Sequence, residues 1–166
     1  MKKNLILLLS IILVWTIGCA SKKEVVKKDI VDPNVMISNQ NEQLTRFPIG
    51  GFGYKSSRLP SQEWRDWAEA AKPIVEDVIT KIPEGYVLQV TGHADASGPE
   101  EPVGNKPGNI KISNDRARTV FNALQNAGIN SSKLTYKGVG SSDLLYTEDP
   151  RSPKQRRVTF KVVPKE

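Results

Sequence analysis

The stretch Thr91-Gly-His-Ala-Asp-Ala-Ser-Gly98 contains the only histidine of the chain, followed two residues later by a carboxylate. A zinc site here would need His93 and Asp95 together with acids such as Glu100 and Glu101, because no cysteine is near enough to complete a ligand set. A His–Asp catalytic pair would need a nucleophile and an oxyanion hole, and no motif positions a serine for that role. The sequence therefore predicts no metal, no cofactor and no catalytic site.

Arg116 is the second residue of interest, because the sequence predicts it in the first turn of a helix that Ser113 would cap. A cation at that position opposes the helix dipole by about 0.3–1 kcal/mol, so stability alone would favour glutamate there. An arginine beside free helix N–H groups is, however, a strong carboxylate receptor. A surface arginine paired with Asp115 or Asp95 is the alternative, and the residues alone leave the two interpretations open.

Asp95 and Arg116 could meet at one edge of a sheet. Asp95 follows a predicted strand, and Arg116 belongs to the helix expected to pack beside that strand. A carboxylate and a guanidinium in close proximity would bind a zwitterion, with its ammonium at Asp95 and its carboxylate at Arg116. This chemistry suits the free end of an amino acid that carries a second amine and a second carboxyl group.

Apolar periodicity predicts the elements that must position these residues. The order β-α-β-α-β-β indicates an α+β sandwich, in which a mixed sheet has its helices packed on one face. Pro73 predicts a kink or a break in the first helix, and Gly92, Gly138 and Gly140 are places where the backbone needs a positive φ or a close approach to a neighbour. The predicted strands are 46–54 (irregular), 86–92, 133–140 and 157–163, and the predicted helices are 61–82 and 113–127.

The N-terminal residues have the features of a secretory signal. Two lysines precede an apolar run over 5–15, and small residues lead to Cys19, the only cysteine of the chain. This arrangement resembles a bacterial lipobox, which implies cleavage before Cys19, acylation of its thiol and a lipid anchor. Ala20, in place of an aspartate that some bacteria use for inner-membrane retention, favours the outer membrane.

Three segments are therefore predicted: a lipoprotein signal peptide over 1–18, a lipidated N-terminus and flexible tether over 19–46, and one domain over 47–166. The 166 residues are 38% hydrophobic and 25% charged, which suits a single globular domain with extra segments. The formal net charge is +6, and a positive protein behind a secretion signal matches an anionic extracytoplasmic polymer better than nucleic acid.

Four stretches follow one another in the order "TGHADASG", "NIKISNDRARTVFNALQNAGI", "LTYKGVGSSDLL" and "QRRVTFKV". Together they resemble the OmpA-like peptidoglycan-binding domain family, which occurs in outer membrane protein A, in peptidoglycan-associated lipoprotein and in flagellar motor proteins. The family pattern is roughly Gly-His-(Thr/Ala)-Asp-x-x-Gly, then Asn-x-x-Leu-Ser-x-x-Arg-Ala, then Gly-x-Gly and Asn-Arg-Arg-Val. The resemblance covers about residues 50–163.

The resemblance implies roles for individual residues. Asp95 and Arg116 match the pair that the family uses to hold diaminopimelate, or an equivalent residue, of the peptidoglycan stem peptide. Asn109 matches an asparagine that helps hold the peptide, and Arg156 matches the ligand-facing member of the family's arginine pair. The other positions that match the family's binding site are Ala94, Ile112 and Lys55.

Three features depart from the family pattern. The loop over 96–108 is longer than usual, and could form a lid over the pocket or block it. Gln155 replaces the usual asparagine before the arginine pair, and Lys55 stands where the family often has Asp or Asn. None of these departures removes the pair formed by Asp95 and Arg116.

These features predict a non-enzymatic binding module: an outer-membrane lipoprotein that faces the periplasm and holds the stem peptide of peptidoglycan. Its expected partners are peptidoglycan and, through Cys19, the membrane, with other envelope proteins as further candidates. An adaptor that has lost peptidoglycan binding and binds proteins is the alternative. An enzyme such as a muramyl hydrolase would need an acid/base pair in the cleft, and the sequence indicates one carboxylate facing one arginine.

Overall fold

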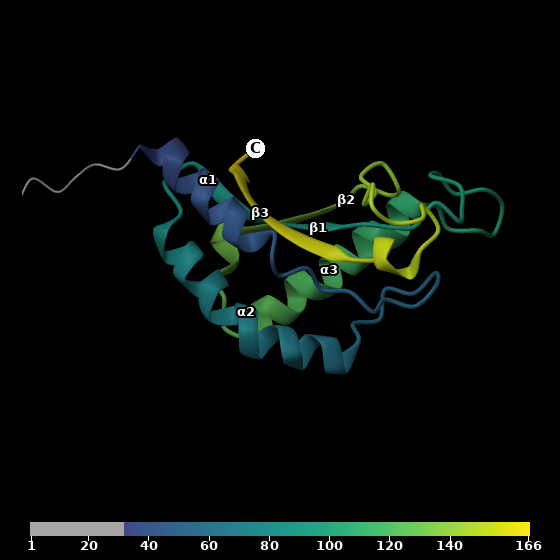
Figure 1. Cartoon of the computed structure of the whole chain (residues 1–166), viewed down its shortest axis with the longest axis horizontal. Helices are drawn as coiled ribbons and strands as arrows, with labels where there is room; N and C mark the ends of the chain where they lie inside the picture. Colours follow the sequence, from purple (N-terminus) through teal and green to yellow (C-terminus); the bar gives the residue numbers. More distant parts are fainter. Residues whose placement is uncertain (1–31) are drawn as a thin grey trace, which may run out of the picture. The chain divides into compact units, whose positions relative to one another are not determined.

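A three-stranded mixed sheet of order β2-β1-β3 forms the centre of the structure (Figure 1). In this computed structural model, which describes residues 32–166, β1 (Tyr86–Gly92) runs parallel to β2 (Leu134–Gly138) and antiparallel to β3 (Val158–Pro164). The predicted signal peptide and Cys19 lie outside the described residues. None of the described helices combines the length and apolar character needed to cross a membrane.

Helices α2 (Ser61–Lys81) and α3 (Asn109–Asn126) lie on the same side of the sheet (Figure 1). Their apolar faces bury against the strands, and this burial is the main source of stability for a fold of this kind. The predicted α+β architecture, with a mixed sheet and helices on one face, is thus confirmed. The core includes Trp67, Ala71 and Val75 of α2, Ala117, Val120 and Leu124 of α3, and Leu88, Val90 and Phe160 of the strands.

Helix α2 is one helix from Ser61 to Lys81, so Pro73 does not break it, although the ribbon bends near the middle of the helix (Figure 1). Proline lacks the N–H that would bond one turn back, which costs a helix roughly 3 kcal/mol. The buried face of α2 offsets this cost, because Trp67, Ala71 and Val75 are all at most 6% exposed on both sides of the proline. Tertiary packing therefore overrides the local preference.

The first predicted strand, over 46–54, is reduced to a single β-bridge. Ile49 exchanges two backbone hydrogen bonds with Val158, of 2.9 and 2.8 Å. Beyond that pair, Gly51 has a φ of 75° and Lys55 a φ of 53°. These left-handed conformations interrupt an extended chain, so the segment leaves the sheet and becomes a loop.

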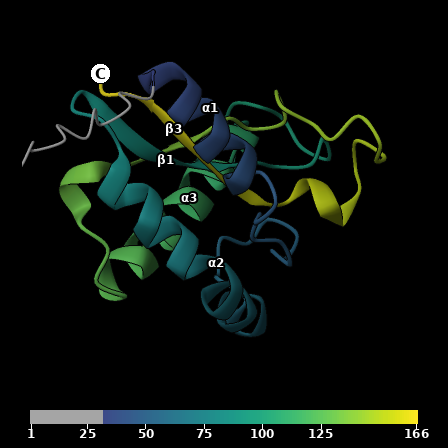
Figure 2. The same ribbon diagram turned by 60° about the vertical axis from the view of Figure 1, so that its left-hand side comes forward.

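Part of the predicted tether is helical. Helix α1 (Pro33–Leu44) lies along β3 (Figure 2). The side-chain amide of Asn41 donates to the Val162 carbonyl at 3.2 Å and accepts from the Val162 N–H at 2.7 Å, as the backbone of a neighbouring strand would. This helix was not predicted from the sequence, because few of its side chains are apolar. Leu44 is its one buried aliphatic residue.

We expect Asn41→Ala to lower the free energy of unfolding by about 1–3 kcal/mol, because it leaves the backbone donor and acceptor of Val162 without partners. Urea denaturation followed by circular dichroism measures the change. Asn39→Ala, at an exposed position of the same helix, is the control and should change stability by less than about 0.5 kcal/mol. Equal effects of the two substitutions would contradict the docking of α1 on β3.

Candidate functional site

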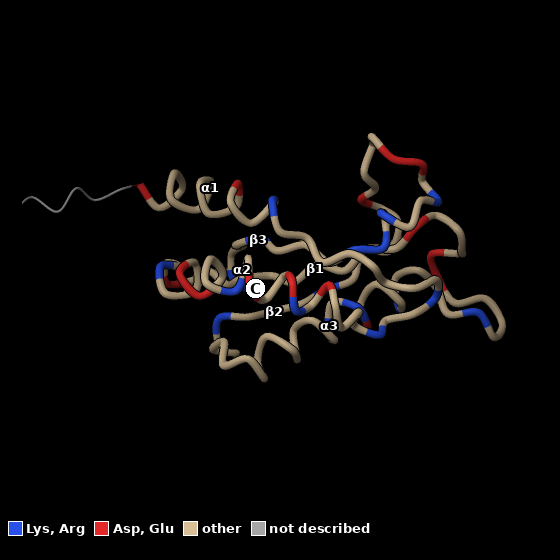
Figure 3. Tube along the Cα trace, turned by 60° about the horizontal axis from the view of Figure 1, so that its bottom comes forward, with Lys and Arg blue, Asp and Glu red and all other residues tan. Residues whose placement is uncertain are grey.

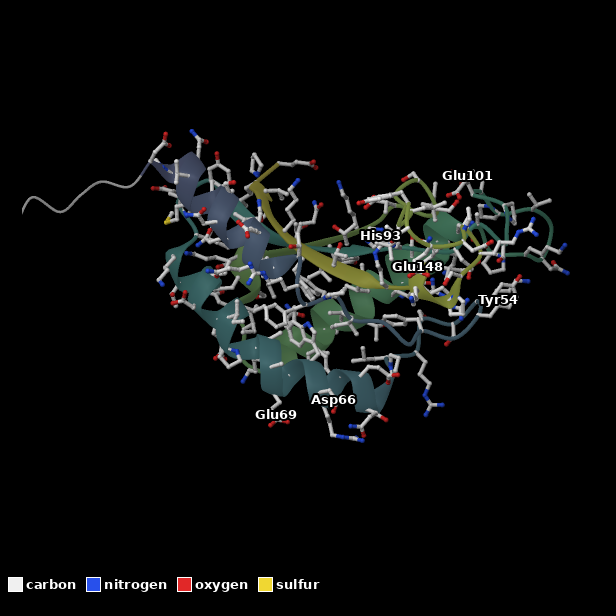
Figure 4. All side chains as sticks on the ribbon, viewed as in Figure 1. Tyr54, Asp66, Glu69, His93, Glu101 and Glu148 are labelled. Carbon is white, nitrogen blue, oxygen red and sulfur yellow. The ribbon has the colours of Figure 1, made fainter. Side chains whose placement is uncertain are left out.

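A cavity of about 100 Å³ lies at the carboxyl end of β1, among loops that include the one carrying Tyr54 (Figure 4). Residues from three separate segments form its walls: the loop before α2, the residues that follow β1, and the first turns of α3. Six of the seven binding residues that the resemblance implied line this cavity, and they are Lys55, Ala94, Asp95, Asn109, Ile112 and Arg116.

Helix α3 begins at Asn109, four residues before the predicted start at Ser113. The preceding loop makes this possible, because the Pro99 and Glu100 carbonyls accept from the first two helical N–H groups at 2.8 and 3.2 Å. Arg116 therefore follows the first helical residue by seven positions and lies beyond the first turn. The prediction that the helix dipole acts on Arg116 was wrong.

Two glycines allow α3 to lie directly on the sheet. A Cβ at Gly92 would collide with the carbonyl oxygen of Ser113, and one at Gly138 would collide with the backbone of Asn114. The Ser113 hydroxyl uses this proximity and accepts from the Gly140 N–H at 2.9 Å. The close approaches predicted at both glycines are confirmed, and they bring α3 against the ends of β1 and β2.

Arg116 is buried, with 1% of its surface exposed, and its guanidinium binds backbone carbonyls. Nε donates to Ser56 at 2.8 Å, Nη1 to His93 at 2.9 Å and Nη2 to Gly53 at 3.0 Å. The ring centroid of Phe52 lies 5.6 Å from Cζ, within the range of a cation–π interaction. Arg116 thus fixes the loop before α2 to the end of β1.

The guanidinium of Arg116 keeps some capacity for a ligand. A guanidinium has five N–H donors, so two of those on Arg116 have no partner within residues 32–166. Burial and the nearby Arg156 lower the pKa of Arg116 to about 10, and Asp95 opposes this shift. The group remains charged at neutral pH, so it presents a poorly solvated cation to any carboxylate that enters the cavity.

Asp95 is paired with Arg156, whereas the sequence suggested a pair with Arg116. Its Oδ2 accepts from Nη1 of Arg156 at 2.8 Å, and its Oδ1 accepts from the Ser97 N–H at 3.0 Å. Burial raises the pKa of Asp95, but the hydrogen bonds from Arg156 and Ser97 outweigh burial and hold the pKa below its usual value. A carboxylate has about four acceptor sites, so ionised Asp95 can still accept from a ligand.

Arg156 does not line the cavity, in contrast to the ligand-facing role that the resemblance implied. Besides its bond to Asp95, Arg156 donates from Nε to the Phe52 carbonyl at 2.7 Å. It therefore holds the Asp95 carboxylate in position without lining the cavity itself. The neighbouring Gln155 is fully buried, and its amide both donates to the Leu145 carbonyl at 3.1 Å and accepts from the Leu145 N–H at 2.8 Å. This glutamine, at the family's asparagine position, therefore holds the loop between β2 and β3.

The long loop over 96–108 forms one wall of the cavity and does not fill it. Asn109 ties the loop to α3, because its Nδ2 donates to the Gly98 carbonyl at 3.1 Å and to the Glu100 carboxylate at 3.3 Å. The same carboxylate accepts from the backbone N–H and the hydroxyl of Ser141. Asn109 thus shapes the wall of the cavity as well as lining it.

His93 braces the end of β1 against its neighbours. It is 1% exposed, with Nε2 2.9 Å from the Thr159 hydroxyl and Nδ1 3.3 Å from the Asp143 carbonyl oxygen. Burial, assisted by Arg157, lowers the pKa of His93 to about 4, so the ring is neutral at pH 7. In the described part of the chain, no three His, Cys, Asp or Glu side chains gather as a metal site would require.

The model of the OmpA family matches residues 52–158, which is more than half of the chain. The chain therefore belongs to the OmpA family. OmpA-like domains typically bind peptidoglycan in the cell envelope and are generally not enzymes. A comparison with curated proteins found no match.

Solved OmpA-like and MotB structures have the same fold. The OmpA-like domain of FopA1 from Francisella tularensis subsp. tularensis SCHU S4 is 22% identical with a TM-score of 0.52, over 70% of this chain and 71% of that chain. The C-terminal domain of Helicobacter pylori MotB is 18% identical with a TM-score of 0.53, over 71% and 84% of the two chains. A putative MotB-like protein from Desulfovibrio vulgaris is 16% identical with a TM-score of 0.50, over 81% and 96%.

Six further residues that line the cavity were not predicted from the sequence, and they are Tyr54, Ser97, Gly98, Pro99, Lys106 and Pro107. Tyr54 and Ser97 adjoin residues that were identified, and their adjacency was the available signal. Lys106 comes from the loop over 96–108, which is longer than the family pattern, so only the folded loop reveals its place at the cavity.

We expect Arg116→Lys to lower the free energy of unfolding by at least about 2 kcal/mol. An ammonium cannot reach the Gly53, Ser56 and His93 carbonyls together, and buried acceptors that lose a charged donor are costly. Arg118→Lys, on the exposed face of the same helix, is the control and should have an effect below about 0.5 kcal/mol. Urea denaturation of both variants decides the matter, and a stable Arg116→Lys protein would refute the structural role of the guanidinium.

Stability should fall as the pH drops from 6.5 to about 4. The unfolded state binds a proton to His93 in this window and the folded state does not, so the loss reaches about 3 kcal/mol. Asp95, whose folded pKa is depressed, adds its own loss only at lower pH. Urea titrations between pH 7 and pH 4.5 measure the slope. His93→Gln should flatten it, and an unchanged slope in that variant would assign the dependence elsewhere.

Proposed function

We propose that the protein binds peptidoglycan non-covalently through the stem peptide and ties the outer membrane to the cell wall. The observation that carries this proposal is the convergence of six expected binding residues on one cavity. The family supports the ligand class, because OmpA-like domains typically bind peptidoglycan. The stem peptide is inferred from the charged residues of the cavity, and the anchoring membrane is inferred from the N-terminal sequence.

The charged groups of the cavity fit the free end of diaminopimelate. The two remaining N–H donors of Arg116 suit the carboxylate of the ligand. Asp95, held ionised by Arg156, suits its ammonium. A cavity of about 100 Å³ is smaller than the usual 300–1,000 Å³ of a small-molecule site, so it admits an end group and leaves the rest of the peptide outside.

The anchoring part of the proposal rests on the N-terminal sequence. Cys19, behind an apolar run and small residues, is the proposed site of lipidation, and the lipid would hold the protein at the periplasmic face of the outer membrane. Residues between Cys19 and α1 would span the distance to the domain. In this proposal the binding module itself has no catalytic role.

We expect Asp95→Asn to reduce retention on isolated peptidoglycan sacculi at least tenfold. The substitution keeps the shape and one of the two acceptor oxygens that bind Arg156 and Ser97, and it removes the charge that attracts the ammonium of the ligand. Co-sedimentation with sacculi, followed by quantitative blotting, measures the loss. Asp66→Asn, on the outer surface of α2 far from the cavity (Figure 4), is the matched control and should be retained like the wild type.

Circular dichroism must show that Asp95→Asn is folded, because Asp95 also organises the loops around it. A folded Asp95→Asn protein that sediments with sacculi as well as the wild type does would refute the proposed site. A wild type that does not sediment with sacculi would favour the adaptor alternative, in which the domain binds proteins.

A further inference from the structure

The walls of the cavity carry an excess of positive charge. Lys55, Lys106 and Arg116 line it, and Asp95 is the single acid that does so. The carboxylate of Asp95 also pairs with Arg156 at 2.8 Å, which adds a further cation just outside the lining. In Figure 3 the loops at this end of the sheet carry both basic and acidic residues. One bound carboxylate at Arg116 would leave the two lysine charges unmatched.

The two lysines approach the cavity from different segments. Lys55 follows Tyr54 in the loop before α2, and its Nζ lies 5.2 Å from the centroid of the exposed Tyr54 ring. Lys106 belongs to the long loop, where its backbone exchanges two hydrogen bonds of 3.1 Å with Val103 and so forms a hairpin. Both side chains are exposed, and neither takes part in an ion pair within the part of the chain that the structure describes.

Lys55 also has a backbone that an ordinary surface lysine would avoid. Its φ of 53° makes it the one non-glycine residue with positive φ among residues 32–166. This conformation costs a residue with a Cβ roughly 1–2 kcal/mol relative to the right-handed region. The tight turn that imposes it is fixed from inside by Arg116, which binds the carbonyls of Gly53 and Ser56 on both sides. The buried Arg116 therefore fixes the backbone position of Lys55.

From these observations we propose that Lys55 and Lys106 form an anion-binding rim that recognises a second carboxylate on the peptide whose end group enters the cavity. The inference rests on the proposed function, because it takes the ligand to be a stem peptide. The cavity admits only the end group, so in this proposal the adjoining residue of the peptide lies at its mouth, near the two exposed lysines that line it. When that residue is a γ-linked glutamate, its α-carboxylate is the group that the rim would bind.

The rim thus distinguishes a free carboxylate from an amide at the adjoining residue. A carboxamide has the same shape but no charge, so it loses the attraction of both lysines while the end group still binds Arg116 and Asp95. Because the lysines are exposed, each contributes modestly, and we expect the free acid to bind about fivefold more tightly than the amide at low salt. The preference should shrink as salt is added, since exposed charges are screened.

The experiment compares two synthetic tripeptides, alanyl-γ-glutamyl-diaminopimelate with either a free α-carboxyl or an α-carboxamide on glutamate. Calorimetric titration of the full chain in detergent gives both dissociation constants. The wild type should prefer the free acid about fivefold. The Lys55→Gln/Lys106→Gln variant should bind the two peptides with equal affinity. Lys137→Gln, an exposed lysine on β2, should keep the wild-type preference.

The outcomes separate this inference from the proposed function. Equal affinity of the wild type for both peptides would overturn the rim and leave stem-peptide binding intact. A preference that persists in the double variant would overturn the assignment to these lysines. Binding of neither peptide by the wild type would overturn the proposed function and the rim together.

Discussion

The burial of one guanidinium constrains the whole end of the molecule where the cavity lies. Arg116 is 1% exposed and must find acceptors for its donors, because an unpaired buried charge costs several kcal/mol. It finds them in the carbonyls of Gly53, Ser56 and His93, on two separate segments. Those segments therefore cannot move independently, and the walls of the cavity are set by the same bonds that satisfy the arginine.

Several other features serve to bring Arg116 to this place. Gly92 and Gly138 let α3 approach the sheet without a Cβ in the way. The Pro99 and Glu100 carbonyls satisfy the first N–H groups of α3, so the helix can begin early and carry the arginine on its second turn. A separate pair, Asp95 with Arg156, then places a carboxylate in the same cavity. The site is pre-organised because structural bonds, and not the ligand, hold its groups.

Much of the fold could be predicted from the sequence, because apolar periodicity reports burial directly. The alternation in β1 and the stripe of Ala117, Val120 and Leu124 predicted elements that the structure contains. The periodicity could not reveal α1, whose docking depends on the amide of Asn41, a polar contact between residues far apart in the chain. It also could not show that the strand before α2 shrinks to the single bridge at Ile49.

The sequence predicted which residues belong to the site better than it predicted which of them form ion pairs and hydrogen bonds with each other. The resemblance named Asp95, Asn109 and Arg116, and all three line one cavity. The sequence could not tell that Asp95 pairs with Arg156, since which cation a carboxylate meets depends on three-dimensional packing. It also could not tell how many donors of Arg116 the backbone already uses. Such bonds between distant segments follow from the fold and leave no local pattern.

The measurement that tests this account most directly is a titration of the isotope-labelled protein with alanyl-γ-glutamyl-diaminopimelate, followed by nuclear magnetic resonance. The account predicts saturable shifts of the Arg116 Nε–H resonance and of the amides of Ser97 and Asn109, which surround the cavity. The amide resonance of Val162, whose N–H donates to Asn41 on the side of β3 that contacts α1, should not shift. Shifts at that edge without shifts at the cavity would contradict the claim that a cavity organised by Arg116 receives the peptide.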